Sequence, residues 1–354
     1  MDRVVLRAAD LDGYLTAEDR VNIEKMNRYY DEASKTFDLL SKSSDSEEIK
    51  NGNARLVKLY SAMGDMMQEI TVKEPAIRVY SFETPRNTHG EASRLIAKLR
   101  DSRTDHHEFV YYIQRAYEML FNLAFCGMDV QKKNYLIVKT PVTDPVQNYA
   151  IHKIPDVDSE IENSVMCVML RGSLLPSMIM SKEIQEYSSR GYVTPFALFR
   201  IHRDENRKEH DMEYILDLNR SFIDLDQLQD KDLFFADPMN ATGGSLVTIV
   251  KFLRSRGIRP RSIRFFNVIS ALKGALRIVR ALENATVYTL WMDPVLNERA
   301  YILPGLGDAG DRLNGTDEGD HPRNIIQLIA DYGSNIAALY RAQVRKIEET
   351  VIGR

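Results

Sequence analysis

The stretch "DLFFADPMNATGGSLVTIVKFL" at residues 232–253 constrains the fold most strongly, because it reads as a buried strand, a glycine-containing turn and a helix. A short apolar run is typical of a strand in a parallel sheet, and apolar residues recur at helical spacing from Leu246 until Gly257. A helix N-terminus presents unpaired N–H groups and the positive end of a dipole. The turn between the strand and the helix is therefore predicted to bind an anion.

Around this unit, from residue 78 to residue 316, short apolar runs alternate with helical segments. That alternation is typical of an α/β domain with a mostly parallel sheet flanked by helices. The expected helices are at about 90–101, 105–124 and 271–283, and the expected strands are at 135–138, 164–170, 194–201, 232–236, 262–270 and 286–292.

Helical extensions are predicted on both sides of this domain, at residues 1–77 and 317–354. Apolar side chains within 56–70 and within 325–347 each form one stripe at helical spacing. A lone amphipathic helix is marginal in water, so each stripe is expected to be buried against something. Two hypotheses follow: the extensions serve assembly and contribute no ligand groups, or they pack on their own subunit.

Composition excludes several classes of function. Lys and Arg total 47 against 51 Asp and Glu, a balance that argues against whole-surface binding to nucleic acid or an anionic membrane. No apolar run approaches the about 20 residues that span a bilayer. The two cysteines, Cys126 and Cys167, form no CxxC pair, which favours a reducing cytoplasm. No metal site is predicted, because the adjacent His106 and His107 diverge on a helix and lack a third ligand.

The turn at residues 237–245 differs from two common phosphate-binding loops. It lacks the Gly-Lys-Ser/Thr ending of a nucleoside-triphosphate loop and the three-glycine dinucleotide fingerprint. A single phosphate suits it better, held by N–H groups and by the hydroxyls of Thr242 and Ser245. Asp237, at the end of the strand, is placed to accept hydrogen bonds from vicinal ribose hydroxyls. A phosphorylated ribose fits both halves of the turn.

Two segments of the chain resemble the uracil phosphoribosyltransferase family. "ADPMNATGGS" at 236–245 is similar to the family's loop for phosphoribosyl diphosphate (PRPP), and "YILPGLGDAGDRLNGT" at 301–316 is similar to its uracil-binding segment. The order and spacing of the two segments also resemble the family, with a strand, a helix and a strand between them.

Further segments extend this resemblance over about residues 79–316. "MLRGSLLP" at 169–176 resembles the family's "LRAG" loop, and "FRIHRDEN" at 199–206 resembles its "MYRNEE" arm. "RLIAKLRDSRTDHHEF" at 94–109 resembles its opening helix. The family's loop and arm place an arginine on the pyrophosphate, which here implies Arg171 and Arg203.

The resemblance implies a phosphoribosyltransferase-type (type I) fold and an enzyme that transfers the phosphoribosyl group from PRPP to uracil, giving UMP and pyrophosphate in pyrimidine salvage. It also implies Mg²⁺ bound with PRPP, and a homo-oligomer with a dimer favoured. The implied catalytic residues are Asp237, Asp308 and Arg171. The implied PRPP-binding residues are Arg171, Arg203, Asp237, Pro238, Met239, Asn240, Ala241, Thr242, Gly243, Gly244, Ser245 and Asp308. The implied uracil-binding residues are Ile302, Gly307, Asp308 and Ala309.

A regulator on the same fold, which binds PRPP or UMP without efficient catalysis, is the alternative hypothesis. The two near-complete glycine-rich segments favour the enzyme, whereas the long extensions and the altered arm keep the regulator open. The departures from the family pattern are few. Asn240 replaces the usual leucine of the loop, Gly172 and Ser173 replace Ala-Gly, and the arm after Arg203 is unusually polar. A panel of bases tested with PRPP and Mg²⁺ discriminates between the enzyme and the regulator.

Overall fold

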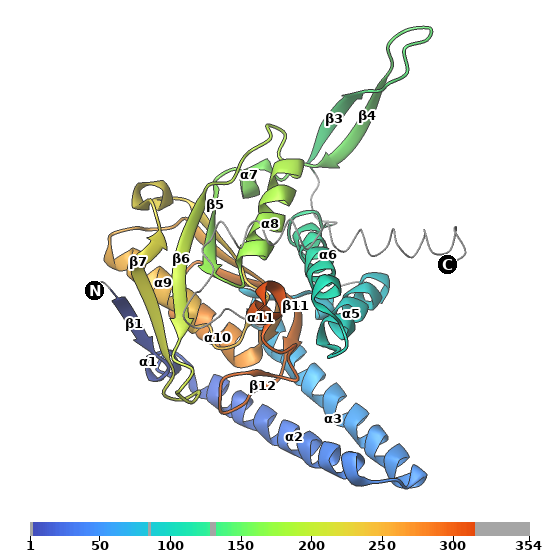
Figure 1. Ribbon diagram of the computed structural model, residues 1–354, viewed down its shortest axis with the longest axis vertical. Helices are drawn as coiled ribbons and strands as arrows, with labels where there is room; N and C mark the ends of the chain where they lie inside the picture. Colours follow the sequence, from blue (N-terminus) through green and yellow to red (C-terminus); the bar gives the residue numbers. More distant parts are fainter. Residues whose placement is uncertain (1–2, 84–85, 128–131, 316–354) are drawn as a thin grey trace.

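The computed structural model describes residues 3–83, 86–127 and 132–315 (Figure 1). Within these ranges, nine strands form one central sheet in the order β1-β7-β6-β5-β8-β10-β11-β2, with β9 paired to β10 off this path. The strands are β1 Arg3–Arg7, β2 Ile77–Val79, β5 Ser164–Leu170, β6 Phe196–Arg203, β7 Glu213–Phe222, β8 Asp232–Ala236, β9 Met239–Asn240, β10 Ser262–Ala271 and β11 Ala285–Asp293.

The sheet is parallel from β6 through β5, β8, β10 and β11 to β2, and only its β7–β1 side is antiparallel among the described strands. β8 shows why this arrangement suits its sequence: Phe234 and Phe235 point to opposite faces and are both fully buried. A strand covered on both faces needs apolar side chains at every position. The structure confirms the predicted mostly parallel α/β sheet flanked by helices.

Two hydrophobic cores lie on the two faces of the sheet. One core joins Phe235 and its neighbours to α9 and α10 and to the N-terminal segment. The other joins Phe234 and its neighbours to α5, α6, α8 and α11. The flanking helices are α4 Tyr80–Glu83, α5 Arg86–Arg100, α6 His106–Phe125, α7 Asp158–Ile161, α8 Leu174–Tyr187, α9 Gly244–Ser255, α10 Leu272–Ala281 and α11 Ala309–Asn314. None of the described helices is long and apolar enough to cross a bilayer.

The N-terminal segment is not wholly helical, which corrects the prediction for residues 1–77. It begins with β1, which pairs antiparallel with β7, and it ends in β2, which pairs parallel with β11. The segment therefore supplies both edges of the central sheet. β7 would otherwise present a row of unpaired backbone groups, so pairing with β1 outweighs any local helical preference.

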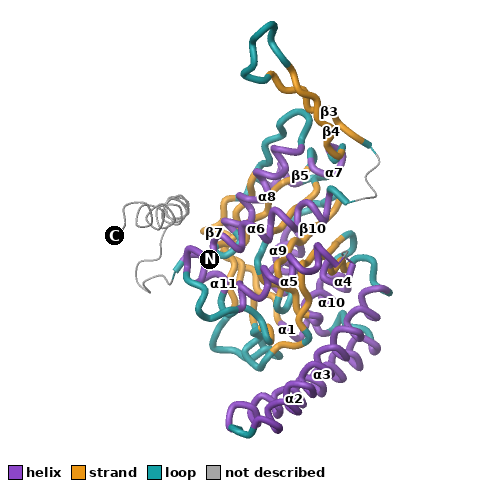
Figure 2. Tube along the Cα trace, turned by 90° about the vertical axis from the view of Figure 1, so that its right-hand side faces the viewer, coloured by secondary structure: helices purple, strands orange, loops and turns teal. Residues whose placement is uncertain are grey.

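Between these two strands the N-terminal segment is helical, as predicted. α1 Ala8–Asp12 is followed by α2 Ala17–Lys42 and α3 Ser46–Val72, which form a long antiparallel hairpin at one end of the molecule (Figures 1 and 2). In the stripe on α3, Met63, Met66 and Met67 are buried in the core shared with α9 and α10. This stripe packs on its own subunit. The predicted C-terminal extension at 317–354 lies outside the described residues.

A second hairpin projects from the opposite end of the molecule (Figures 1 and 2). It consists of β3 Lys133–Lys139 and β4 Tyr149–Pro155, which pair antiparallel in a sheet of their own. The strand predicted at 135–138 belongs to this hairpin and not to the central sheet. The apolar run at 135–138 predicted a strand correctly, but only the tertiary structure decides which sheet that strand joins.

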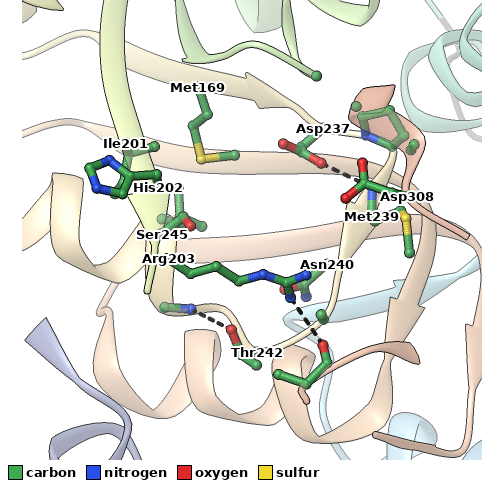
Figure 3. Close-up of a pocket in the computed structure, with 18 of the residues that line it drawn as sticks. Met169, Ile201, His202, Arg203, Asp237, Met239, Asn240, Thr242, Ser245 and Asp308 are labelled. Carbon is green, nitrogen blue, oxygen red and sulfur yellow. Dashed lines mark hydrogen bonds between the residues drawn. The ribbon is translucent and has the colours of Figure 1, made fainter. Parts of the chain in front are cut away.

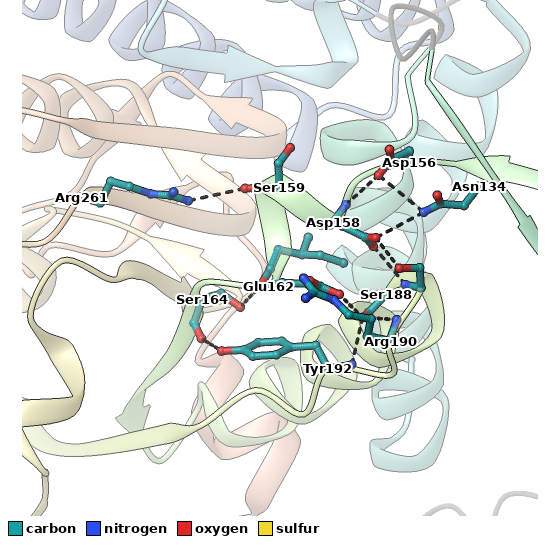
Figure 4. Close-up of polar contacts among 12 residues, drawn as sticks. Asn134, Asp156, Asp158, Ser159, Glu162, Ser164, Ser188, Arg190, Tyr192 and Arg261 are labelled. Atoms are coloured by element: carbon teal, nitrogen blue, oxygen red, sulfur yellow. Dashed lines mark hydrogen bonds and ion pairs between the residues drawn. The ribbon is translucent and has the colours of Figure 1, made fainter.

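Polar contacts join the start of β5 and the residues just before it to the segment that follows α8 (Figure 4). The Tyr192 hydroxyl donates to the Ser164 carbonyl at 2.7 Å, and Arg190 forms an ion pair with Glu162. Asp158 accepts from the Ser189 amide at 3.0 Å. These contacts fix the N-terminal end of β5, and its carboxyl end therefore lies in a defined position.

Candidate active site

Every residue predicted to bind PRPP or uracil lines one cavity of about 310 Å³. The cavity lies where β5, β6 and β8 reach their carboxyl ends, which is where open α/β sheets bind ligands. In Figure 3, Asp237 and Asp308 lie beside each other, and the Arg203 side chain extends from β6 towards Asn240. The roles of the individual residues remain predictions, but the structure brings all of them together.

The turn between β8 and α9 depends on two glycines for its shape. Gly243 caps α9 with φ +74°, and a Cβ there would lie 2.8 Å from the Ile278 side chain and 2.9 Å from the Gly274 carbonyl oxygen. A Cβ on Gly244 would lie 2.2 Å from the Tyr214 ring. The N-terminus of α9 therefore packs closely against both α10 and β7. Its first residues line the cavity together with Thr242, so unpaired helix N–H groups and a hydroxyl are available to a ligand there.

Asp237 is held at both of its carboxylate oxygens. Ser173 Oγ donates to Oδ2 at 2.8 Å, and the Met239 amide donates to Oδ1 at 3.0 Å. The pKa of this carboxyl is raised to about 6, because burial and the nearby Asp308 disfavour its ionised form more than the two hydrogen bonds favour it. Asp237 is thus ionised above neutral pH and oriented as a hydrogen-bond acceptor.

Two arginines reach the cavity from neighbouring strands. Arg171 follows β5, and its Nη2 lies 3.0 Å from Asp311 Oδ1. Arg203 ends β6, where its guanidinium donates to the Ala300 carbonyl at 3.3 Å and stacks 4.8 Å from the centre of the Tyr301 ring. Guanidinium groups bind phosphate oxygens in a bidentate manner, so this pair is suited to a pyrophosphate.

The opposite wall of the cavity is main chain from the segment before α11. Gly307 has φ +79°, and Asp308 caps α11 by accepting from the Asp311 amide at 3.0 Å. Arg100 and Asp293 form an ion pair at 2.5 Å and also bind the carbonyl and the amide of Gly305. This ion pair fixes the turn whose backbone faces the cavity.

Sequence reasoning missed several residues of the site. Tyr214 and Tyr301 line the cavity, and Ser173 binds Asp237 from behind. Tyr214 belongs to β7, where the alternation of Tyr214, Leu216 and Leu218 was the available strand signal. In the sequence, the signal for Ser173 is its departure from the family pattern, which has a glycine at this position.

Comparison with known proteins agrees with this arrangement. Residues 87–316 match the family model described as uracil phosphoribosyltransferase. The chain belongs to the uracil phosphoribosyltransferase family. The uracil phosphoribosyltransferase of Limosilactobacillus fermentum is 39% identical over 117 residues, which are 33% of this chain and 52% of that protein. That of Streptococcus mutans is 43% identical over 116 residues, 33% of this chain and 51% of that protein.

The chain thus spans about half the length of these curated members of the uracil phosphoribosyltransferase family. Among solved structures, the AQ2163 protein from Aquifex aeolicus is similar with a TM-score of 0.46 and 21% identity, covering 65% of this chain and 96% of that one. Within the described part of this family member, no three His, Cys, Asp or Glu side chains are grouped so that they could hold a metal ion.

Proposed function

We propose that this protein transfers the phosphoribosyl group of PRPP to N1 of uracil, producing UMP and pyrophosphate in pyrimidine salvage. The observation that carries the proposal is the cavity that joins the phosphate-type turn at 237–245 to the glycine-rich main chain at 302–309. One wall suits a phosphorylated ribose and the other suits a planar base. Family membership supports the same reaction.

In the proposed complex, the N-terminus of α9 with Thr242 and Ser245 holds the 5′-phosphate. Asp237 accepts hydrogen bonds from the ribose hydroxyls, and Arg171 and Arg203 bind the pyrophosphate. Arg171 exchanges its contact with Asp311 for the ligand. Mg²⁺ enters as part of the substrate, bound to PRPP oxygens, and shares the charge of the leaving group.

Glycosyl transfer of this kind builds positive charge on the ribose and negative charge on the departing pyrophosphate. The two arginines stabilise the negative charge, while Asp237 and Asp308 place carboxylates near the sugar. No side-chain nucleophile is required by this scheme. Positioning and electrostatic stabilisation supply the acceleration.

Main chain around Ile302 and Gly307–Ala309 selects the base. Uracil presents an acceptor, a donor and an acceptor along one edge, which backbone N–H and C=O groups can match. Cytosine presents a donor at position 4, so a backbone donor would be left unpaired, at a cost of about 1–3 kcal/mol. We therefore propose uracil over cytosine as the substrate.

We also propose that the protein works as a homodimer in the cytoplasm. Support for the dimer comes from the β3–β4 hairpin, where Tyr135, Ile137, Tyr149 and Ile151 lie on one face and are each more than 60% exposed. An apolar face of this kind is suited to a two-fold contact with a second copy. The free thiols of Cys126 and Cys167 are consistent with a reducing compartment.

A base panel tests the function. The protein is incubated with PRPP, Mg²⁺ and uracil, cytosine, hypoxanthine or orotate, and nucleotide and pyrophosphate are quantified. The proposal expects UMP and pyrophosphate in equal amounts with uracil alone. Binding of PRPP or UMP without turnover of any base would instead establish the alternative hypothesis, a regulator. The ion pair between Arg171 and Asp311 favours that alternative, because the pair engages an arginine that the proposed reaction needs.

A further inference from the structure

Ser173 is a fully buried serine behind the cavity, at the start of α8. Its position would allow its hydroxyl to cap the helix, yet the side chain makes no capping hydrogen bond. The hydroxyl instead donates to Asp237 Oδ2 at 2.8 Å, across 64 residues of sequence. Ser173 does not line the cavity itself, so any influence on a ligand acts through Asp237.

We propose that Ser173 is a positioning residue for PRPP, because its hydroxyl holds the Asp237 carboxylate in the orientation that accepts the ribose hydroxyls. The inference rests on the proposed function, in which Asp237 binds the ribose. An ionised carboxylate offers about four lone-pair sites. Ser173 and the Met239 amide occupy one site on each oxygen, which leaves a second site on each oxygen for the ligand.

The surroundings of Asp237 explain why this hydrogen bond matters. Burial disfavours the ionised form of Asp237, and so, to a smaller extent, does Asp308, which lies at the cap of α11 and faces Asp237. Tyr117 on α6 also lies close, with its hydroxyl donated to the Phe266 carbonyl. Arg171 lines the same cavity but pairs with Asp311. Hydrogen bonds from Ser173 and Met239 are the contacts that lower the pKa of Asp237 and so favour its ionised form.

The same helix supplies a matched control. Ser177 lies one turn further along α8 and is also fully buried, but its hydroxyl has no hydrogen-bond partner among the described residues. Replacing either serine with alanine removes one buried hydroxyl from the same helix. Only the replacement at Ser173 removes a contact with the site.

The test compares Ser173→Ala, Ser177→Ala and wild type between pH 5 and pH 9. The quantities measured are kcat/KM for PRPP, KM for uracil, and the PRPP dissociation constant by calorimetry. Ser173→Ala is expected to move the acid limb of kcat/KM for PRPP to higher pH by roughly one unit, since a hydrogen bond to the charged form is lost. KM for PRPP rises severalfold at pH 8, KM for uracil is unchanged, and Ser177→Ala matches wild type.

Two further variants keep the test decisive. Ser173→Gly also removes the hydroxyl and replaces Ser173→Ala if that variant does not fold. In an Asp237→Asn background, Ser173→Ala should have no further effect on PRPP affinity, because the two groups act as one unit. An unshifted acid limb in both Ser173 variants, or an equal shift in Ser177→Ala, overturns the inference. Wild type that binds no PRPP at any pH overturns the proposed function instead.

Discussion

The guanidinium of Arg277 forms a partly buried ion pair with Asp12, with 2.6 Å between Arg277 Nη2 and Asp12 Oδ1. Arg277 lies on α10 with a fully buried side chain, and the same nitrogen lies 2.8 Å from Glu209 Oε1. The first turn of α10 packs on the phosphate-type turn, since a Cβ on Gly274 would lie 2.4 Å from the Ala241 carbonyl oxygen. The N-terminal segment is thus linked to the site, although it contributes none of the residues that line the cavity.

This link predicts an unequal effect of two aspartate substitutions on stability. Asp12→Ala leaves the Arg277 guanidinium with Glu209 as its remaining carboxylate, and the loss of one of its two charge-assisted contacts is expected to cost about 1–3 kcal/mol. Asp38→Ala removes an exposed pair with Lys42 and is expected to cost less than about 1 kcal/mol. Urea unfolding of both variants measures the difference. Equal losses of unfolding free energy would show that the contact of Asp12 with the buried Arg277 guanidinium contributes no more than an exposed ion pair.

The raised pKa of Asp237 predicts that its ionised carboxylate destabilises the folded protein. The folded-state pKa is about 6, above the ordinary value of 3.8, so ionising Asp237 is harder in the folded state than in the unfolded state. Relative to Asp237→Asn, wild type should lose stability as the pH rises from about 4 to 6, and the difference should stay constant at higher pH. We expect Asp237→Asn to be more stable by about 1–3 kcal/mol at pH 7.5.

Thermal or urea unfolding at several pH values tests this expectation. Values at about pH 3 or below serve as the internal control, because Asp237 is then protonated in both the folded and the unfolded wild type. The same substitution should lower kcat/KM for PRPP at least about tenfold, since a carboxylate acceptor is lost. A variant that is less stable than wild type at pH 7.5 would show that Asp237 supports the fold.

Glycine substitutions at the two ends of α9 should separate binding from stability. Gly243→Ala introduces a Cβ at φ +74° and in contact with Ile278, so the phosphate-type turn must move. We expect KM for PRPP to rise at least about tenfold with little change for uracil. Gly257→Ala, at φ +83° beyond the other end of α9, meets no atom within 4 Å.

The Gly257→Ala variant is therefore the control for backbone strain alone. It is expected to lower the unfolding free energy by about 1 kcal/mol and to leave both KM values unchanged. Steady-state kinetics with PRPP and uracil varied in turn gives the comparison. If Gly243→Ala changed both KM values equally, the turn would be structural and not a phosphate site.

The exposed face of the β3–β4 hairpin predicts an effect on assembly. Ile137 and Ile151 lie directly opposite each other on this face, 63% and 65% exposed. Ile137→Asp is expected to reduce the mass measured by light scattering from that of a dimer to that of a monomer, because a charge cannot be buried there without a partner. Leu136→Asp, on the other face of the same strand, should leave the dimer intact. A wild-type protein that is monomeric at micromolar concentration would refute the dimer.

Local sequence was sufficient for the elements that surround the site. β5 and β8 occur where apolar runs predicted them, at 164–170 and 232–236. The turn at 237–245 could be interpreted because glycine, threonine and serine at a helix start have local conformational and hydrogen-bonding consequences. The family resemblance then associated this turn with the segment at 301–316, and the two segments do face one cavity.

The sequence by itself therefore determined the fold class and the positions of the buried strands around the site, because short-range periodicity encodes them. It also indicated the phosphate-type turn, because the backbone requirements of that turn are local, while the other predicted site residues came from the family resemblance. Tertiary structure alone decided which strands form the sheet edges, that residues 3–7 pair with β7, and that β3 leaves the central sheet. It also decided that Ser173 binds Asp237 and that Asp12 neutralises Arg277, 265 residues away. Such pairs form because burial brings distant polar groups into an apolar interior, where each must find a partner, and no local pattern records that choice.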